Sequence, residues 1–259
     1  MKIPIRRRLL STLLVVCAST AAFAQGAYWE SMLSGGPFGD QPVLHKTYYM
    51  PRMAKTVQGS GETVIIRIDR ELLYTINPET REYMETSFAD LEKAAGKTSA
   101  KMEEMKKQLE SMPPEQRKMV EQMMGGKMGG DQKASVTPAG ETKTISGWHC
   151  SKYTVQYGDM EFTVWATKDI KQTESMRKDW EQVNRRMAAL SGGGAAKGLG
   201  EAMMKIDGFT VETEMPQGIK NVVTKYENRS TPASEFEVPA GYTKKENKLL
   251  LEGNPQENQ

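Results

Sequence analysis

The chain of 259 residues carries 35 Lys and Arg against 33 Asp and Glu, so its formal net charge is only +2. Residues 1–24 hold one Lys, three Arg and no acid, and the rest of the chain therefore has a net charge of −2. A near-neutral surface exerts no strong attraction on nucleic acid or on an anionic membrane, so we expect no nucleic-acid partner.

The N-terminus has the three parts of a secretory signal peptide. A basic start at Lys2 and residues 6–8 is followed by an apolar run over 9–22 and by the small-x-small end Ala22-Phe23-Ala24. We expect cleavage after Ala24, which leaves 235 residues in the periplasm or outside the cell. The apolar run is too short for a spanning helix, and we predict no transmembrane segment in the mature chain.

Residues 25–44 mix aromatic residues with Gly, Pro and Ser without a period, which predicts a flexible N-terminal arm. A single domain is expected over 45–243. Its first clear strand is marked by Val64, Ile66 and Ile68, which alternate with other residues.

Two further strands are predicted directly after this one. Leu72, Tyr74 and Ile76 share one face of the next strand, and Asn77-Pro78-Glu79-Thr80 is a strong turn sequence because Asn77 can bond the backbone ahead of it. Residues 82–86 return as a third strand. Short strands with minimal turns predict an antiparallel meander.

A Met-rich helical insertion is expected over 87–128. Ser87 and Asp90 have the spacing of a capping box, so a helix begins there, and Gly96 is expected to end it. A second helix should carry its apolar stripe on Met102, Met105, Leu109 and Met112, and a third should bury Met119, Val120, Met123 and Met124. Residues 125–140 are rich in Gly and predict a flexible linker.

The most clearly defined hairpin spans Gly147 to Asp169, with its turn at Gly158-Asp159. Phe162, Val164 and Ala166 share one face of its second strand. An amphipathic helix follows over 173–191, with Met176 and Trp180 on its apolar side. Strands at 209–215 and 219–228 form a last hairpin, and the polar residues 244–259 are predicted to be a disordered tail.

Groups able to catalyse a reaction are few. The chain has two His, His45 and His149, and neither lies in a nucleophile motif. His149 and Cys150 are adjacent on a strand and therefore point to opposite faces. Cys150 is the one Cys of the expected mature chain, and we predict that it is buried as a hydrophobic residue. We therefore predict no catalytic residue and no enzymatic activity.

Methionine is unusually frequent, with 18 residues, many of them within the expected insertion. Thioethers are ligands for Cu(I), and the pairs Met102/Met105 and Met119/Met123 are spaced so that two sulfurs can share one ion. The same positions are where an amphipathic helix needs apolar residues, and flexible Met fills irregular cores. We predict packing residues, with no metal or other cofactor, and keep copper handling as an alternative function.

Four segments carry a resemblance to a known family: IIRIDRELLYTINPETREYME, GWHCSKYTV, FTVWATKDI and FEVPAGY. Their order resembles an uncharacterised exported family of unknown function, which is similar in turn to the LolA/LolB-type lipoprotein carriers. The resemblance implies an α+β fold, in which a curved antiparallel sheet forms an unclosed half-barrel with amphipathic helices across its concave face. In those carriers the space between sheet and helices holds acyl chains.

The predicted function is that of a non-enzymatic periplasmic or envelope protein that binds a lipid, acyl chain or lipoprotein between sheet and helices. The alternatives are copper handling and a structural role with other envelope proteins. The residues predicted to line the ligand space are Val64, Ile66, Ile68, Leu72, Tyr74, Ile76, Met102, Met105, Leu109, Phe162, Val164, Met176 and Trp180.

Overall fold

The computed structural model describes residues 26–113, 115–117, 119, 134–158, 160–190 and 194–247, without the side chains of 98, 102, 106, 188–190 and 194–197. The strands are β1 (Ala27–Ser34), β2 (Val43–Met50), β3 (Met53–Val57), β4 (Thr63–Arg67), β5 (Leu72–Asn77), β6 (Glu82–Ser87), β7 (Ala134–Ile145), β8 (Trp148–Tyr157), β9 (Met160–Thr167), β10 (Phe209–Glu214), β11 (Lys220–Asn228) and β12 (Thr243–Lys245).

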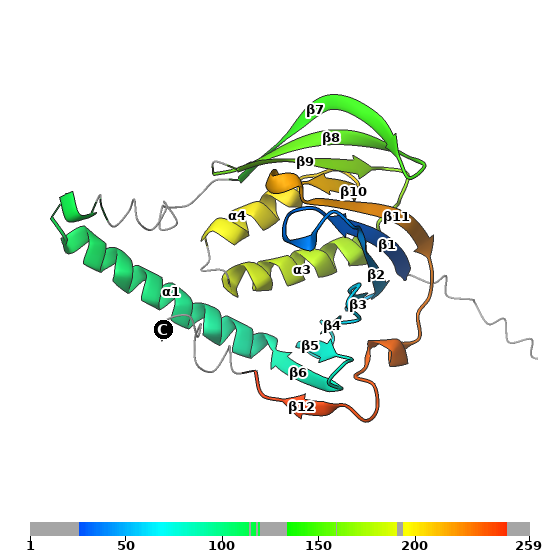
Figure 1. Ribbon diagram of the computed structural model, residues 1–259, viewed down its shortest axis with the longest axis horizontal. Helices are drawn as coiled ribbons and strands as arrows, with labels where there is room; N and C mark the ends of the chain where they lie inside the picture. Colours follow the sequence, from blue (N-terminus) through cyan, green and yellow to red (C-terminus); the bar gives the residue numbers. More distant parts are fainter. Residues whose placement is uncertain are drawn as a thin grey trace, which may run out of the picture.

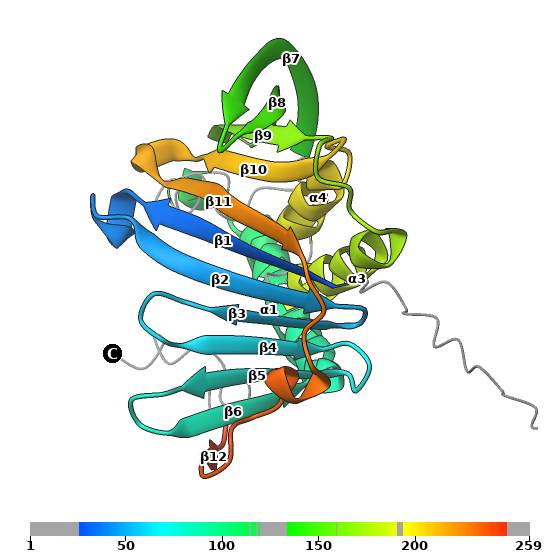
Figure 2. The ribbon, with the colours of Figure 1, turned by 90° about the vertical axis from the view of Figure 1, so that its right-hand side faces the viewer.

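All twelve described strands belong to one sheet in the order β12-β6-β5-β4-β3-β2-β1-β11-β10-β9-β8-β7. The pair β12 and β6 is parallel, and every other pair of neighbours is antiparallel. The sheet curves without closing, since β12 and β7 are its two edges (Figure 2). The prediction of an unclosed, mostly antiparallel half-barrel is confirmed.

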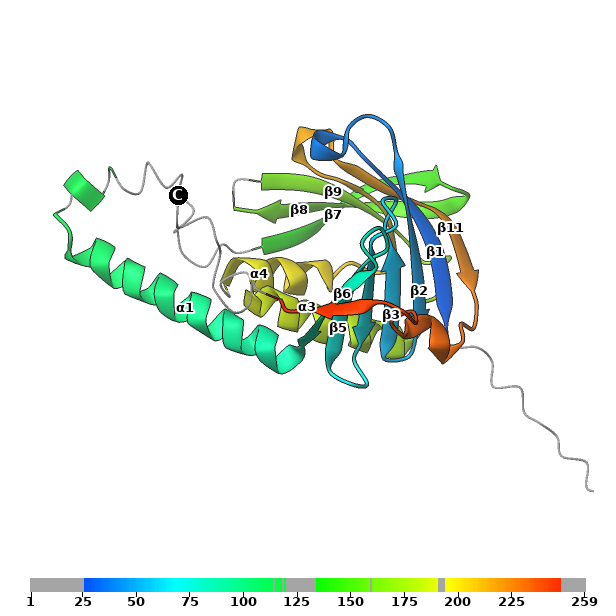
Figure 3. The ribbon, with the colours of Figure 1, turned by 60° about the horizontal axis from the view of Figure 1, so that its bottom comes forward.

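The helices are α1 (Phe88–Ser111), α3 (Glu174–Leu190) and α4 (Gly194–Met203), with short 3-10 turns η1 (Gly36–Phe38), η2 (Pro216–Gly218) and η3 (Ala233–Phe236). Helices α3 and α4 lie inside the curve of the sheet, on what we call its inner face (Figure 1). Helix α1 packs along α3, and its far end extends beyond the sheet (Figures 1 and 3).

Local sequence signals account for several of these boundaries. The side chain of Asn77 accepts hydrogen bonds from the backbone N–H groups of Glu79 and Thr80 at 2.9 and 3.2 Å, which closes the turn between β5 and β6. The Ser87 hydroxyl accepts from the backbone N–H of Asp90 at 3.0 Å and donates to its carboxylate at 2.6 Å. Both the turn and the capped start of α1 were predicted from the sequence.

The expected N-terminal arm is instead a central strand. Residues of β1 pair with β2 on one side and β11 on the other, so this segment joins the two halves of the sheet. Ala27 and Tyr28 are both buried although they point to opposite faces. A strand covered on both faces shows no alternation of apolar and polar residues, which is why its sequence showed no period.

The helical insertion also differs from the prediction. Helix α1 continues through Gly96 to Ser111, because one Gly costs a helix only about 1 kcal/mol, which packing can offset. Met119 is 64% exposed and not buried. Residues 134–140 belong to β7 and not to a linker, and 244–245 belong to β12 and not to a disordered tail. The expected signal peptide lies outside the described residues, as do 125–133 and 248–259.

The outer face of β3 to β6 is covered by the segment that contains η3. This segment runs in front of the strands in Figure 2, whereas α1 lies behind them. Phe236 is completely buried there against Ile65, Tyr74 and Ile76. Burying a Phe side chain contributes about 1.5–3 kcal/mol to the free energy of unfolding. This contact therefore helps to hold the C-terminal segment on the outer face of the sheet.

Arg67 joins the same segment to β4. Its side chain is 4% exposed and bonds both carboxylate oxygens of Asp69, at 2.8 and 2.6 Å. It also bonds the Glu237 carboxylate at 2.5 Å and the Phe236 carbonyl at 3.3 Å. A buried guanidinium is tolerated because its donors are occupied by these acceptors.

We predict that Arg67→Met lowers the free energy of unfolding by about 3 kcal/mol, measured by urea denaturation. The value is at the lower end for breaking a buried ion pair because water can reach the two carboxylates left behind. Arg70→Met is the matched control, since Arg70 is 48% exposed and also binds Glu237, and it should cost less than about 1 kcal/mol. Equal losses in the two variants would contradict this role of Arg67.

The same network predicts an acid dependence. The hydrogen bonds from Arg67 hold the pKa of the Asp69 carboxyl below its ordinary value. A pKa lowered by folding stabilises the protein above the unfolded-state value of about 3.9, and this stability is lost as the pH falls through the folded-state pKa. The unfolding free energy of Asp69→Asn should therefore decrease less between pH 5 and pH 3 (about one unit either side of that value) than that of the wild type. Parallel pH profiles would show that Asp69 is not coupled to folding.

Candidate functional site

The pairing of β4 with β5 divides the predicted ligand-lining residues between the two faces of the sheet. Ile65 lies opposite Tyr74 and Ile66 opposite Leu73, so odd residues of β4 share a face with even residues of β5. Val64 and Ile66 therefore point to one face, whereas Leu72, Tyr74 and Ile76 point to the other. A shift of register by a single residue would reverse this, and the turn between the strands fixes it.

The outer set lies under η3. Tyr74 and Ile76 are buried in the cluster around Phe236, and Leu72 packs against that cluster. Ile68 is buried just beyond the end of β4, where its N–H donates to the Arg52 carbonyl at 2.9 Å. Leu72, Tyr74 and Ile76 therefore have structural partners away from the space beneath the helices.

The inner set is spread along the concave face. Val164 is buried and Phe162 half-buried in a cluster that also receives Leu199 and Met203 of α4. Val64 and Ile66 are half-buried at the other half of the sheet. We call Val64, Ile66 and Leu73 the inner strip, because Leu73 pairs with Ile66 and shares its face.

Two of the predicted helical residues, both on α3, pack against the central strands. Met176 of α3 is buried against Ala27 and Tyr49, and Trp180 lies with its ring centroid 6.4 Å from that of Trp29. On α1, Leu109 is buried and Met105 half-buried. The side chain of Met102 lies outside the described residues.

Asp179 holds α3 on the inner face. Its side chain is 7% exposed and accepts from the Tyr49 hydroxyl at 2.8 Å and from the backbone N–H of Arg52 at 2.6 Å. Burial raises the pKa of Tyr49 well above its ordinary value, with a further contribution from Asp179, so the phenol stays a donor at neutral pH. These two bonds fix the distance between α3 and the β2–β3 turn.

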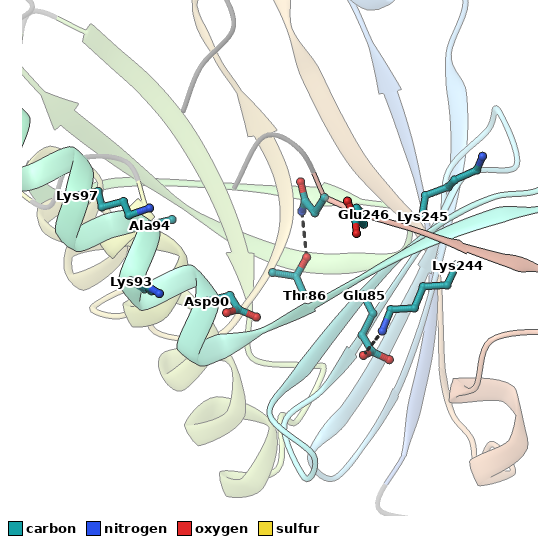
Figure 4. Close-up of a pocket in the computed structure, with 10 residues that line it drawn as sticks. Glu85, Thr86, Asp90, Lys93, Ala94, Lys97, Lys244, Lys245 and Glu246 are labelled. Atoms are coloured by element: carbon teal, nitrogen blue, oxygen red, sulfur yellow. Dashed lines mark hydrogen bonds and ion pairs between the residues drawn. The ribbon is translucent and has the colours of Figure 1, made fainter. Parts of the chain in front are cut away.

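A pocket of about 530 Å³ lies beside the inner face, between the first turns of α1, strand β6 and the chain from β12 onward (Figure 4). Its lining residues are Glu85, Thr86, Asp90, Lys93, Ala94, Lys97, Lys244, Lys245, Glu246 and Asn247. Thr86 pairs with Leu73 of the inner strip, so the pocket meets the strip at β6.

Hydrogen bonds and ion pairs occupy part of this pocket wall. Lys244 binds Glu85 at 2.7 Å, and the Asn247 amide donates to the Thr86 hydroxyl at 3.0 Å. Lys93 and Lys97 form no ion pair with any residue that the structure describes. One part of this pocket wall could have been predicted from the sequence, because residues 90, 93, 94 and 97 fall on one side of a helix. Their neighbours near residue 245 cannot be found from helical spacing.

The structure also places the residues of the two alternative sites considered from the sequence, His149 with Cys150 and the methionine pairs. The Cys150 thiol is buried, and burial raises its pKa, whereas the His149 side chain is 88% exposed and lies 3.9 Å from Asp169. Of the four Met considered for copper, Met105 is half-buried and Met119 exposed, and the other two side chains are outside the described residues. Within the described ranges, no three His, Cys, Asp or Glu side chains are grouped as metal ligands. No described helix is both long and apolar enough to cross a membrane.

The model of the family named Domain of unknown function (DUF4412) matches residues 112–242. No curated protein matches the chain. An uncharacterized conserved protein from Thermus thermophilus has 7% identity and a TM-score of 0.45, with 86% of this chain and 91% of that chain covered.

Two other solved structures are considerably longer than the matched region. PNGF-II in its C2 crystal form has 9% identity and a TM-score of 0.40, over 87% of this chain and 32% of that chain. A chain of the MucA/MucB complex of Pseudomonas aeruginosa has 8% identity and a TM-score of 0.38, over 84% of this chain and 57% of that chain. The chain thus spans about a third of the first protein and little more than half of the second.

We predict that Asp179→Ala lowers the free energy of unfolding by about 2–4 kcal/mol, because the buried Tyr49 hydroxyl and the part-buried backbone N–H of Arg52 both lose their acceptor. Asp179→Asn keeps one acceptor oxygen and should lose less. Glu181→Ala on the same helix is the control, since it removes an exposed ion pair with Arg185 and should cost about 0.5 kcal/mol or less. Urea denaturation measures all three, and a loss at Asp179→Ala no larger than the control would show that Asp179 does not hold α3.

Proposed function

The chain belongs to the DUF4412 family of unknown function, and from that premise we propose that it is a non-enzymatic envelope protein that binds a hydrophobic ligand between sheet and helices. The ligand class is a lipid, a free acyl chain or the acyl chain of a lipoprotein. The proposal places the mature chain in the periplasm or outside the cell, in keeping with the signal-peptide pattern of residues 1–24.

The observation that carries the proposal is the inner strip. Val64, Ile66 and Leu73 are half-buried, and they belong to none of the four buried hydrophobic clusters that the described residues form. Burial of apolar surface contributes about 25 cal/mol of free energy per Å², and apolar surface that stays in contact with water does not make this contribution. A chain of methylene groups laid on this strip would recover that free energy.

The surroundings of the strip fit such a ligand. The pocket in Figure 4 opens beside it and has the volume of a small-molecule site, which is typically about 300–1,000 Å³. Asp179 keeps α3 in place over the inner face, and α1 packs on α3. An acyl chain would therefore lie under α1 and α3, with its polar end toward the lysines of the pocket.

Mass spectrometry of the protein extracted under gentle conditions tests the proposal, with displacement of a fluorescent fatty acid as the second measurement. A co-purifying lipid and displacement by unlabelled fatty acid are expected. A spectrum of ligand-free protein together with the absence of fluorescent fatty-acid binding would overturn the proposal.

Polar substitution in the strip locates the site. Val64→Thr with Ile66→Thr keeps two β-branched side chains but makes the strip polar, and we expect fluorescent fatty-acid affinity to fall about tenfold. Val57→Thr with Leu72→Thr is the matched control, because both residues are half-buried on the outer face of β3 and β5, the two strands that flank β4. Equal affinities for the two double variants would show that the ligand does not lie on the strip.

A further inference from the structure

A second groove lies at the other half of the sheet, where α3 begins and α4 ends. It has a volume of about 520 Å³ and is lined by Lys168, Ile170, Lys171, Gln172, Arg177, Met204, Lys205, Ile206, Asp207 and Gly208. A smaller pocket of about 180 Å³ shares five of these residues and extends to Trp180, Asn184 and Thr210. We call the larger pocket the outer part of the groove and the smaller pocket its inner end.

The outer part carries a concentrated positive charge. Lys168, Lys171, Arg177 and Lys205 face a single carboxylate, Asp207, which gives the lining a formal charge of +3. Asp207 is occupied by Lys168 at 2.5 Å. The other three cations form no ion pair with any described residue. Because the whole chain is near neutral, this local excess does not follow from composition.

The inner end is apolar on one side. Its walls are formed by Trp180 of α3, Met203 at the end of α4 and Ile206 beyond it, together with the polar side chains of Asn184 and Thr210. Its volume of about 180 Å³ is about a third of that of the outer part. This end therefore suits a short apolar group better than a long acyl chain.

Gly208 allows the two sides of the groove to lie close together. Its φ is +123°, and a Cβ atom there would lie 2.4 Å from the Thr167 carbonyl oxygen. The residue therefore has to be Gly for the chain after α4 to pass close to the end of β9. That close passage places Lys205 and Asp207 opposite Lys168 and Lys171, although they are more than 30 positions apart in the sequence.

We propose that this groove binds a phosphate monoester that carries a short apolar group. A monoester phosphate has a charge of about −1.5 to −2 at pH 7, which three unpaired cations can neutralise. The planar guanidinium of Arg177 bonds two phosphate oxygens at once, and Lys171 and Lys205 add point charges on either side. The apolar group enters the inner end against Trp180 and Met203.

This site is separate from the inner strip. The strip lies on β4 and β5, whereas the groove is built from the connections of β9 and β10 with α3 and α4. It also lies wholly within the segment that matches the family model, residues 112–242. The proposal therefore goes beyond the hydrophobic ligand and does not depend on it.

Isothermal titration calorimetry of the chain without residues 1–24 tests the proposal, with octyl phosphate as the probe. We expect octyl phosphate to bind at least tenfold more tightly than inorganic phosphate, octanoate or uncharged octyl glucoside. If inorganic phosphate or octyl glucoside binds as tightly, the groove does not recognise both ends of one molecule. If octanoate binds more tightly than octyl phosphate to the variant Val64→Thr with Ile66→Thr, whose inner strip is polar, the groove is not a phosphate site.

Charge variants assign the binding to this groove. Arg177→Gln with Lys205→Gln removes two exposed, unpaired cations, so the fold is expected to persist and a melting curve verifies it. Affinity for octyl phosphate should fall at least tenfold. Lys178→Gln with Arg185→Gln is the control, because it removes two exposed charges of α3 that pair with Glu174 and Glu181, and it should change affinity less than threefold.

The inner-strip variant separates the two proposals. Val64→Thr with Ile66→Thr should bind octyl phosphate as the wild type does. A loss equal to that of Arg177→Gln with Lys205→Gln, or a loss in the charge control of the same size, would overturn the groove as the phosphate site.

Discussion

The antiparallel register of β4 and β5 is the constraint on which the structure of this half of the sheet depends. With Ile65 opposite Tyr74, both strands present apolar side chains on both faces, so each face needs its own cover. The C-terminal segment with η3 covers the outer face through Phe236 and Arg67. On the inner face Val64, Ile66 and Leu73 are half-buried and belong to none of the four buried clusters of the described residues, and this is the surface on which we propose that a ligand binds.

Helix α3 connects the two halves of the molecule. Asp179 binds it to the β2–β3 turn, Trp180 lies beside Trp29 of the central strand, and Arg186 forms ion pairs with Glu71 and Glu92 near the start of α1. Its first turn contributes Arg177 to the basic groove. One helix therefore contributes to the geometry of both candidate sites, and Trp180 both packs on Trp29 and lines the inner end of the groove.

Much of the local structure could be predicted from short-range chemistry. The Asn77 turn, the cap at Ser87 and the hairpin around Gly158 each depend on residues within a few positions of one another. The central strand β1 could not be predicted, because a strand buried on both faces has no alternation to detect. The break expected at Gly96 did not occur, since packing against α3 outweighs the intrinsic cost of one Gly.

The sites were harder to predict than the elements, because they depend on pairings between distant residues. The sequence showed that Val64 and Ile66 share one face of their strand and that Leu72 and Tyr74 share one face of the next. Which of these two sets faces the helices is decided by the register between the strands. The basic groove joins Lys171 to Lys205, and the pocket of Figure 4 joins Lys93 to Asn247. Neither spacing corresponds to a helix or strand period, so only the folded chain brings these side chains together.

The central claim is that the half-buried side chains of β4 and β5 beneath the helices contact an apolar ligand. The most direct measurement is photocrosslinking of the protein without residues 1–24 with a fatty acid that carries a diazirine near its methyl end, followed by peptide mapping. The account predicts that the label is found at Val64, Ile66 or Leu73 and is removed by excess unlabelled fatty acid. Labelling of the outer-face residues Tyr74 and Ile76, or labelling that excess fatty acid does not reduce, would contradict it.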